Sequence, residues 1–341
     1  MGDATGTRIT FSANRGDVNV GRLIRRCLVS GLFLLGADKV AYGQLVVTTN
    51  NSQSVYQGST LMITASPVMP QLNLVVSGGE TYCDDLSYTI SINWTAPTGQ
   101  QSMDSLNGDF ACNQTSNVNW ASKFAGGTAT LQWTASTTCS SQSGTLSFQI
   151  LGTNPSPLSV DTLIASPPWF WRNILAWESS AWSASPTGIY HQFNSSGVPI
   201  NCNCPNGIGL TQLDPPSSIL DFWAWPDNEV DGYNLLVSKQ SGASSNWNSE
   251  LSQMMNNNGG HPVWPSYSAG ACNFSATAPS GAPAGGTHSF ADADWIHAYN
   301  SNYFIFWNPP TQPGGTGFWD MDLVSNGKPA YVPNVCNSPA I

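Results

Sequence analysis

Segments in which apolar and polar residues alternate occur repeatedly between residues 44 and 157. The clearest of these segments are 44–49, 60–64, 86–94, 127–133 and 145–150. Alternation with a period of two is typical of a strand with one buried face, and turn-forming residues separate these segments. Short strands spread over about 100 residues predict an all-β immunoglobulin-like sandwich over 44–157. The Gly/Pro-rich run 152–157 predicts a linker to the next domain.

After this linker the apolar residues recur three or four positions apart, which is typical of helices. In the segment 169–182 one stripe contains Phe170, Ile174, Trp177 and Ala181, and its neighbour contains Trp171, Leu175, Glu178 and Trp182. Glu178 therefore shares a helix side with two tryptophans. Ser166 and Pro167 ahead of this segment predict the helix start, with Ser166 as the N-cap and Pro167 in the first turn.

Glu178 is a candidate catalytic group because of this apolar setting. Glutamate occurs only four times in the chain, at positions 80, 178, 229 and 250. A carboxyl group held against indole rings loses hydration, which raises its pKa and lets it keep a proton near neutral pH. Such a group acts as a general acid. A glutamate on a helix is more often a solvated surface residue, so the assignment depends on the rest of the chain.

The first 43 residues have the three parts of a secretory signal peptide. Arg22, Arg25 and Arg26 precede the apolar run 27–37, and small residues two positions apart predict cleavage after Gly43. The apolar run is shorter than the roughly 20 residues that a membrane span needs. A retained membrane anchor is the alternative, because Asp38 and Lys39 are unusual so near a cleavage site. We expect a secreted or periplasmic protein with no membrane contact after cleavage.

The charge of the chain excludes several classes of partner. Without residues 1–43 it has four Lys/Arg against seventeen Asp/Glu, a net charge of −13. A nucleic-acid partner is excluded because phosphate binding depends on clustered cations. Only 9% of the residues are charged, whereas Ser, Thr, Asn and aromatic residues are abundant. This composition suits an exported protein that binds neutral polar ligands such as carbohydrate, and we expect no cofactor.

Seven cysteines remain after the predicted cleavage, and they fall into two groups. The first contains Cys83, Cys112 and Cys139, and the second contains Cys202, Cys204, Cys272 and Cys336. In an oxidising compartment the first group predicts one bridge and a free thiol. The second predicts two bridges, with Cys202 and Cys204 each paired to Cys272 or Cys336. A metal site is the competing interpretation, but Cys-Asn-Cys lacks the spacing of zinc ligands and no histidine pair has it either, so we expect none.

A second informative segment is 207–216, which contains Gly209-Leu210-Thr211-Gln212-Leu213. Its glycines let the backbone approach a ligand closely. The side chain of Gln212 offers both an amide donor and an acceptor. The sequence Asp214-Pro215-Pro216 predicts the cap and first turn of a following helix.

The order of motifs along the second half resembles that of the soluble lytic transglycosylases and goose-type lysozymes. The motifs are Glu178-Ser179, the turn 209–215, Asn228 with Gly232, and Ala298-Tyr299-Asn300. The resemblance covers 165–310 and implies a mainly α, lysozyme-like (α+β) domain over 158–341. Thr211 stands where the family usually has methionine, and we expect 241–290 to be a loop-rich insertion.

The resemblance also implies roles for single residues. Glu178 would be the single catalytic acid/base, Ser179 would orient the substrate, Gln212 would line the cleft, and Tyr299 would bring a hydroxyl near the carboxyl group, with Asn300 beside it as a substrate-binding residue. Asn228 and Gly232 would be helix-packing positions. Glu178 would protonate the glycosidic oxygen of a peptidoglycan glycan strand. It would then take a proton from the muramyl 6-hydroxyl, giving a 1,6-anhydro product, or from water.

Two further possibilities stay open at this level. Hydrolases with two carboxylates need a partner acid opposite Glu178, but the segment 227–231, Asp227-Asn228-Glu229-Val230-Asp231, is expected to be a solvated helix start. The alternative function is a non-enzymatic glycan-binding or adhesion protein with an inactive lysozyme-like cleft. In either case the β-sandwich is available for contact with a protein partner.

Overall fold

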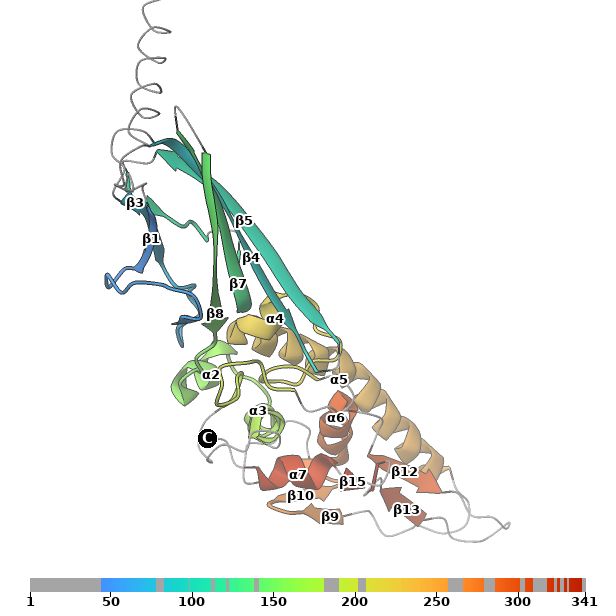
Figure 1. Cartoon of the computed structure of the whole chain (residues 1–341). Coiled ribbons are helices and arrows are strands. Elements are labelled where there is room, and N and C mark those ends of the chain that lie inside the picture. Colours follow the sequence, from blue (N-terminus) through green and yellow to red (C-terminus); the bar gives the residue numbers. More distant parts are fainter. Residues whose placement is uncertain are drawn as a thin grey trace, which may run out of the picture.

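The protein is a mixed fold of strands and helices. The computed structural model describes residues 44–77, 83–97, 99–111, 114–120, 123–137, 141–180, 190–201, 207–256, 266–278, 286–300, 304–308, 318–321, 324–325, 328–329 and 331–338. The predicted signal peptide lies outside these residues. Long strands form one end of the molecule, and helices with short strands form the other (Figure 1).

Two sheets make up the N-terminal half. The larger sheet has the order β2 (Thr60–Met62), β8 (Ser141–Leu151), β7 (Gly127–Thr137), β4 (Cys83–Thr95) and β5 (Gln101–Ala111). The smaller sheet has the order β1 (Gln44–Thr49), β3 (Leu72–Ser77) and β6 (Ser116–Asn117). Each of the five alternating segments contains a strand, so these predictions are confirmed. The pattern missed β3, β5 and β6: β3 alternates only at its start, β5 is largely polar, and β6 has only two residues.

The inner faces of the two sheets share one apolar core. Leu86 and Ile90 of β4 belong to the same buried cluster as Leu72 and Leu74 of β3. Neighbouring residues of a strand point to opposite faces, so the outward residues of β4 are polar. Packing of two sheets through alternating inward residues accounts for the long, regular strands.

Side chains from beyond the predicted linker complete this core. Trp223, at the end of α4 (Leu220–Trp223), is fully buried, and its indole N–H donates to Ser102 Oγ at 3.0 Å. Its ring lies edge-on to Trp94, with 5.7 Å between ring centroids. Gly126 is required here, because a Cβ atom would lie 2.3 Å from the Trp223 ring. The linker 152–157 therefore joins two parts that are also packed against each other.

The second half consists of helices with short strands at their edge. Its other helices are α2 (Pro157–Leu163), α3 (Trp171–Ser180), α5 (Trp225–Met255), α6 (Phe290–Asn300) and α7 (Tyr331–Asn337). The strands are β9 (Ser266–Ala269), β10 (Cys272–Ser275), β11 (Thr287–Ser289), β12 (Ile305–Asn308), β13 (Phe318–Met321), β14 (Val324–Ser325) and β15 (Lys328–Pro329). Among the described residues, no helix combines the length and apolar character of a membrane span.

The long helix α5 corrects the expectation of a loop-rich insertion over 241–290. The chain is helical up to Met255, although Gly, Ser and Asn are frequent there. Leu236, Ala243 and Trp247 are buried on one side of α5, with the spacing of a helix. Burial of this side outweighs the weak helix propensity of the polar residues.

Two predicted helix starts were also wrong. α3 begins at Trp171, whose N–H donates to the Pro168 carbonyl at 2.9 Å, and Ser166 has a positive φ of 52° instead of acting as an N-cap. The residue before a proline is disfavoured in the helical region, so Pro168 disfavours a first turn that includes Pro167. Pro216 has the same effect after Asp214, and α4 begins only at Leu220.

The disulfide pattern differs from the prediction as well. Cys272 in β10 is bonded to Cys336 in α7, with 5.5 Å between the two Cα atoms. Pairing of Cys202 or Cys204 with either of them is therefore wrong, and both residues lie outside the described residues. The bridge predicted within the first cysteine group also involves side chains outside them. The observed bond joins positions 64 residues apart, a proximity that no local pattern encodes.

Substitution of Trp223 tests the contact between the two halves. We expect Trp223→Ala to lower the free energy of unfolding by about 3–5 kcal/mol, because it leaves a large cavity and an unpaired Ser102. Urea denaturation measures this change. Tyr56→Ala is the control, because Tyr56 is 68% exposed and its loss should change stability by less than about 0.5 kcal/mol. Equal, small effects of both substitutions would contradict the shared core.

Candidate functional site

Helix α3 carries Glu178 into the interior. Trp171, Ile174 and Leu175 are fully buried, and the Glu178 side chain is only 4% exposed. Glu178 and Trp171 lie on the same side of the helix, as the spacing predicts. Ala181 and Trp182 of the predicted stripes lie outside the described residues.

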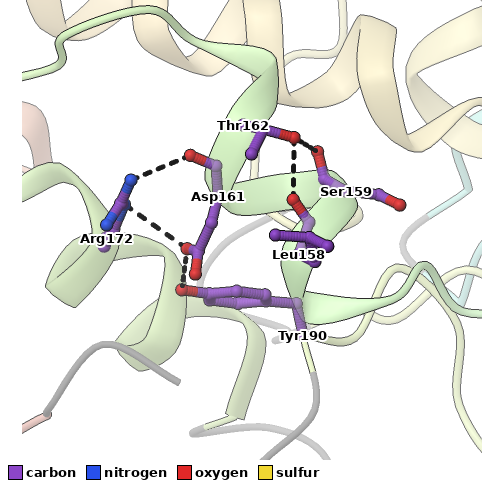
Figure 2. A network of polar contacts seen from close by, with 6 residues as sticks. All are labelled: Leu158, Ser159, Asp161, Thr162, Arg172 and Tyr190. Atoms are coloured by element: carbon purple, nitrogen blue, oxygen red, sulfur yellow. Dashed lines mark hydrogen bonds and ion pairs between the residues drawn. The ribbon is translucent and has the colours of Figure 1, made fainter.

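The first turn of α3 is anchored by Asp161 of α2, as Figure 2 shows. Arg172 donates from Nη2 to the Asp161 carbonyl at 2.9 Å, and its Nε lies 3.4 Å from Asp161 Oδ1. The Tyr190 hydroxyl donates to the same Oδ1 at 3.0 Å. Three segments thus meet at one carboxylate and fix the position of the helix that bears Glu178.

The Glu178 carboxyl group is hydrogen-bonded from two other helices. The Tyr331 hydroxyl of α7 donates to Glu178 Oε1 at 2.5 Å. Burial raises the pKa of Glu178 to about 7, while the hydrogen bonds from Tyr331 and from the Asn300 side chain of α6 lower it. The raised pKa expected from an apolar setting is therefore found. At neutral pH this carboxyl group is poised between its acid and its base form.

The turn 209–213 is held against the start of α5. The backbone N–H of Thr211 donates to Asn228 Oδ1 at 2.8 Å, and Asn228 Nδ2 donates to the Ile208 carbonyl at 3.0 Å. Gly232 makes room for Thr211, because a Cβ atom there would lie 2.6 Å from the threonine side chain. The predicted packing role of Asn228 and Gly232 is confirmed.

Tyr299 of α6 links this turn to Glu178. Its hydroxyl donates to the Thr211 carbonyl at 2.8 Å. Burial raises the pKa of Tyr299 above its ordinary value, and the negative charge of Glu178 raises it further, which shows that the two groups are neighbours. Tyr299 therefore supports the site, while Tyr331 is the tyrosine that donates to the carboxyl group.

The remaining predicted site residues lie at different depths. Ser179 is fully buried, and its hydroxyl has no hydrogen-bond partner among the described residues. Gln212 is half-buried, has a positive φ of 52°, and donates its amide N–H to the Gly209 carbonyl within its own turn. Asn300 is exposed next to Glu178. Of these residues, Asn300 is the most exposed to a ligand at the surface.

Glu229 is a second buried glutamate, which corrects the expectation of a solvated helix start. α5 does begin with Asp227 in its first turn, but Glu229 is only 1% exposed. Burial raises the pKa of Glu229 to about 8, partly offset by the side chain of Trp171. Helical spacing places Glu229 on the buried side with Asn228 and Gly232. The expectation was wrong because charge pattern alone does not identify the buried side.

The sequence gives no signal for Tyr331. It lies 153 residues after Glu178 and outside every motif, so only the packing of α7 against α3 reveals its role.

Within the described residues, no group of three His, Cys, Asp or Glu side chains is arranged to hold a metal ion. Comparison with protein-family models gave no match, and comparison with curated proteins gave none either. The geometry of the site itself supports proton transfer by one carboxyl group.

The pH dependence of stability tests the buried state of Glu178. Its pKa is about 7 in the folded state against an ordinary value of 4.5, so the carboxyl group weakens the fold increasingly between these pH values and fully above pH 7. We expect Glu178→Gln to raise the free energy of unfolding by up to about 3 kcal/mol at pH 8 and to leave it nearly unchanged at pH 4. Urea denaturation at both pH values measures this difference.

The control for this experiment is Glu250→Gln. Glu250 accepts the backbone N–H of Trp307 at 2.6 Å, and its substitution should not stabilise the protein at pH 8. A Glu178→Gln effect that is the same at pH 4 and pH 8 would refute the raised pKa.

Proposed function

We propose that the protein is an exported glycosidase that cleaves the glycan strand of peptidoglycan, as a lytic transglycosylase with Glu178 as its single general acid/base. In this proposal 158–341 is a lysozyme-like domain, and 44–157 is an immunoglobulin-like β-sandwich ahead of it. The observation that carries the proposal is the buried Glu178 carboxyl group, with a pKa of about 7 and a hydrogen bond from Tyr331. The resemblance of the four sequence motifs supports the same activity.

The first step is proton donation by Glu178. At pH 7 about half of the Glu178 groups are protonated, because the pKa is about 7. The proton passes to the glycosidic oxygen, the bond from this oxygen to the anomeric carbon breaks, and positive charge develops on the sugar ring that contains this carbon. The leaving strand takes the bonding electrons as a neutral hydroxyl.

The second step uses Glu178 as a base. The carboxylate is stabilised by the hydrogen bonds from Tyr331 and Asn300 until it takes a proton from the attacking group. If the 6-hydroxyl of the same sugar attacks the anomeric carbon, a 1,6-anhydro ring forms and Glu178 regains its proton. If water attacks, the product is the hydrated sugar. Among the described residues, the groups that set the pKa of Glu178 are Tyr331 and Asn300 and include no second acid, which supports a mechanism with one carboxyl group.

One observation favours the alternative of a non-enzymatic glycan-binding or adhesion protein. Glu178 is only 4% exposed, whereas a general acid has to reach the glycosidic oxygen. A binding protein has no such requirement. The two functions differ in the release of soluble products, which is directly measurable.

The test is mass spectrometry of the soluble fraction after the purified protein is incubated with isolated peptidoglycan. We expect muropeptides with a mass 18 lower than the hydrated sugar, and a loss of at least a thousandfold in their release by Glu178→Gln. Glu229→Gln is the matched control, because Glu229 is also a buried glutamate but has no role in the proposed chemistry. This variant should keep most of the activity. Product release that is unaffected by Glu178→Gln would refute the catalytic role.

The pH profile tests the contact between Tyr331 and Glu178. The hydroxyl lowers the pKa of Glu178, so Tyr331→Phe should raise it and move the alkaline decline in activity to higher pH by about one unit. Tyr299→Phe removes a hydrogen bond to Thr211 instead, and it should leave the position of that decline unchanged even if the rate falls. Equal profiles for the wild type and Tyr331→Phe would show that this hydrogen bond does not tune the acid.

A further inference from the structure

The outer face of the larger sheet carries polar side chains in rows that cross four strands. In the register of β5, β4, β7 and β8, one row consists of Asp109, Ser87, Thr134 and Ser143. All four residues are exposed, because their strand neighbours occupy the inner face. This row presents one carboxylate and three hydroxyl groups at nearly regular spacing across the sheet.

A second row lies two residues further along the strands. It consists of Asn107, Thr89, Gln132 and Thr145. The two rows are about 7 Å apart along the strands and extend about 14 Å across them. Between them lies a shallow cavity of about 470 Å³, lined by both rows. We call this cavity, with its two rows, the polar trough.

Two aromatic side chains on the inner face of the sheet support the strands behind the trough. They are Tyr88 and Trp133, and each lies beside a glycine of the neighbouring strand. A Cβ atom on Gly108 would lie 2.4 Å from the Tyr88 hydroxyl oxygen, and one on Gly144 would lie 2.7 Å from Trp133 Nε1. The rings therefore cover the glycines closely and hold the four strands in register. On the outer side, Thr89 Oγ1 donates to Asn107 Oδ1 at 2.8 Å, which orders part of the second row.

The chemistry of the trough selects among ligands. Its two rows contain one charged residue, Asp109, and no basic residue, in a chain with a net charge of −10. Nucleic acid and anionic lipid are therefore excluded. A peptide that adds as a further strand is disfavoured within the trough, because β4 and β7 are paired on both sides and the free edge of β5 lies at the border of the sheet. Hydroxyl and amide side chains, which both donate and accept, match an uncharged ligand that carries the same groups.

We propose that the polar trough binds a linear, uncharged glycan strand across the four strands, through the hydroxyl and acetamido groups of its sugars. The absence of net charge on such a strand matches the nearly neutral rows on an otherwise acidic protein. This site is separate from Glu178, and its occupancy does not depend on the proposed catalytic activity.

The test is binding of the purified protein to insoluble chitin, an uncharged linear glycan with hydroxyl and acetamido groups. We expect Asn107→Ala/Gln132→Ala to weaken binding about tenfold, because it removes two amide groups from the second row. The matched control is Met103→Ala/Thr128→Ala, which changes the same two strands on the same face, four residues away. It should bind chitin like the wild type, and thermal unfolding checks that both variants are folded.

A second arm uses beads of alginate, a linear glycan with a carboxylate on each sugar. The wild type should bind alginate at least tenfold more weakly than chitin, because the acidic protein repels it. Absence of chitin binding by the wild type, equal binding by the two double variants, or equal binding to alginate would each overturn the proposal. None of these outcomes depends on whether Glu178 cleaves peptidoglycan.

Discussion

The hydrogen bond between the Tyr331 hydroxyl and the Glu178 carboxyl group is the contact on which the helical half depends. A carboxyl group buried in an apolar interior destabilises the fold unless it is protonated or hydrogen-bonded. Tyr331 meets this requirement from α7, a short helix that the Cys272–Cys336 disulfide attaches to β10. The position of one hydroxyl group thus depends on the packing of α3, α7 and the sheet formed by β9, β10 and β11.

A comparison of the two buried glutamates shows how their partners set their protonation. Burial raises the pKa of both side chains, to about 7 for Glu178 and to about 8 for Glu229. Glu178 has hydrogen bonds from Tyr331 and Asn300 that favour its ionised form. The side chain of Trp171 and the charge of Arg172 favour the ionised form of Glu229, whereas the charge of Asp161 opposes its ionisation. Of the two, Glu178 has the pKa nearer to neutral pH.

The two halves are joined by tryptophans as well as by the chain itself. The indole N–H of Trp223 donates to Ser102 in β5, and that of Trp225 donates to the Ala65 carbonyl at 2.8 Å. These contacts bury large side chains and satisfy their only polar atom, so they restrict motion between the larger sheet and α5. The polar trough and the Glu178 site are therefore carried on one packed framework. Under the two proposals made above, this framework would carry a glycan-binding site and a glycan-cleaving site together.

The sequence by itself determined those features that have a local period or a local motif. Alternation located five strands, helical spacing placed Glu178 on a buried side with Trp171, and the order of motifs identified Asn228 and Gly232 as packing positions for the turn at Thr211. Only the tertiary structure decided the partners of these features. Tyr331, the Cys272–Cys336 pair and the burial of Glu229 depend on contacts between residues far apart in the chain, and such contacts are set by the packing of whole helices and sheets.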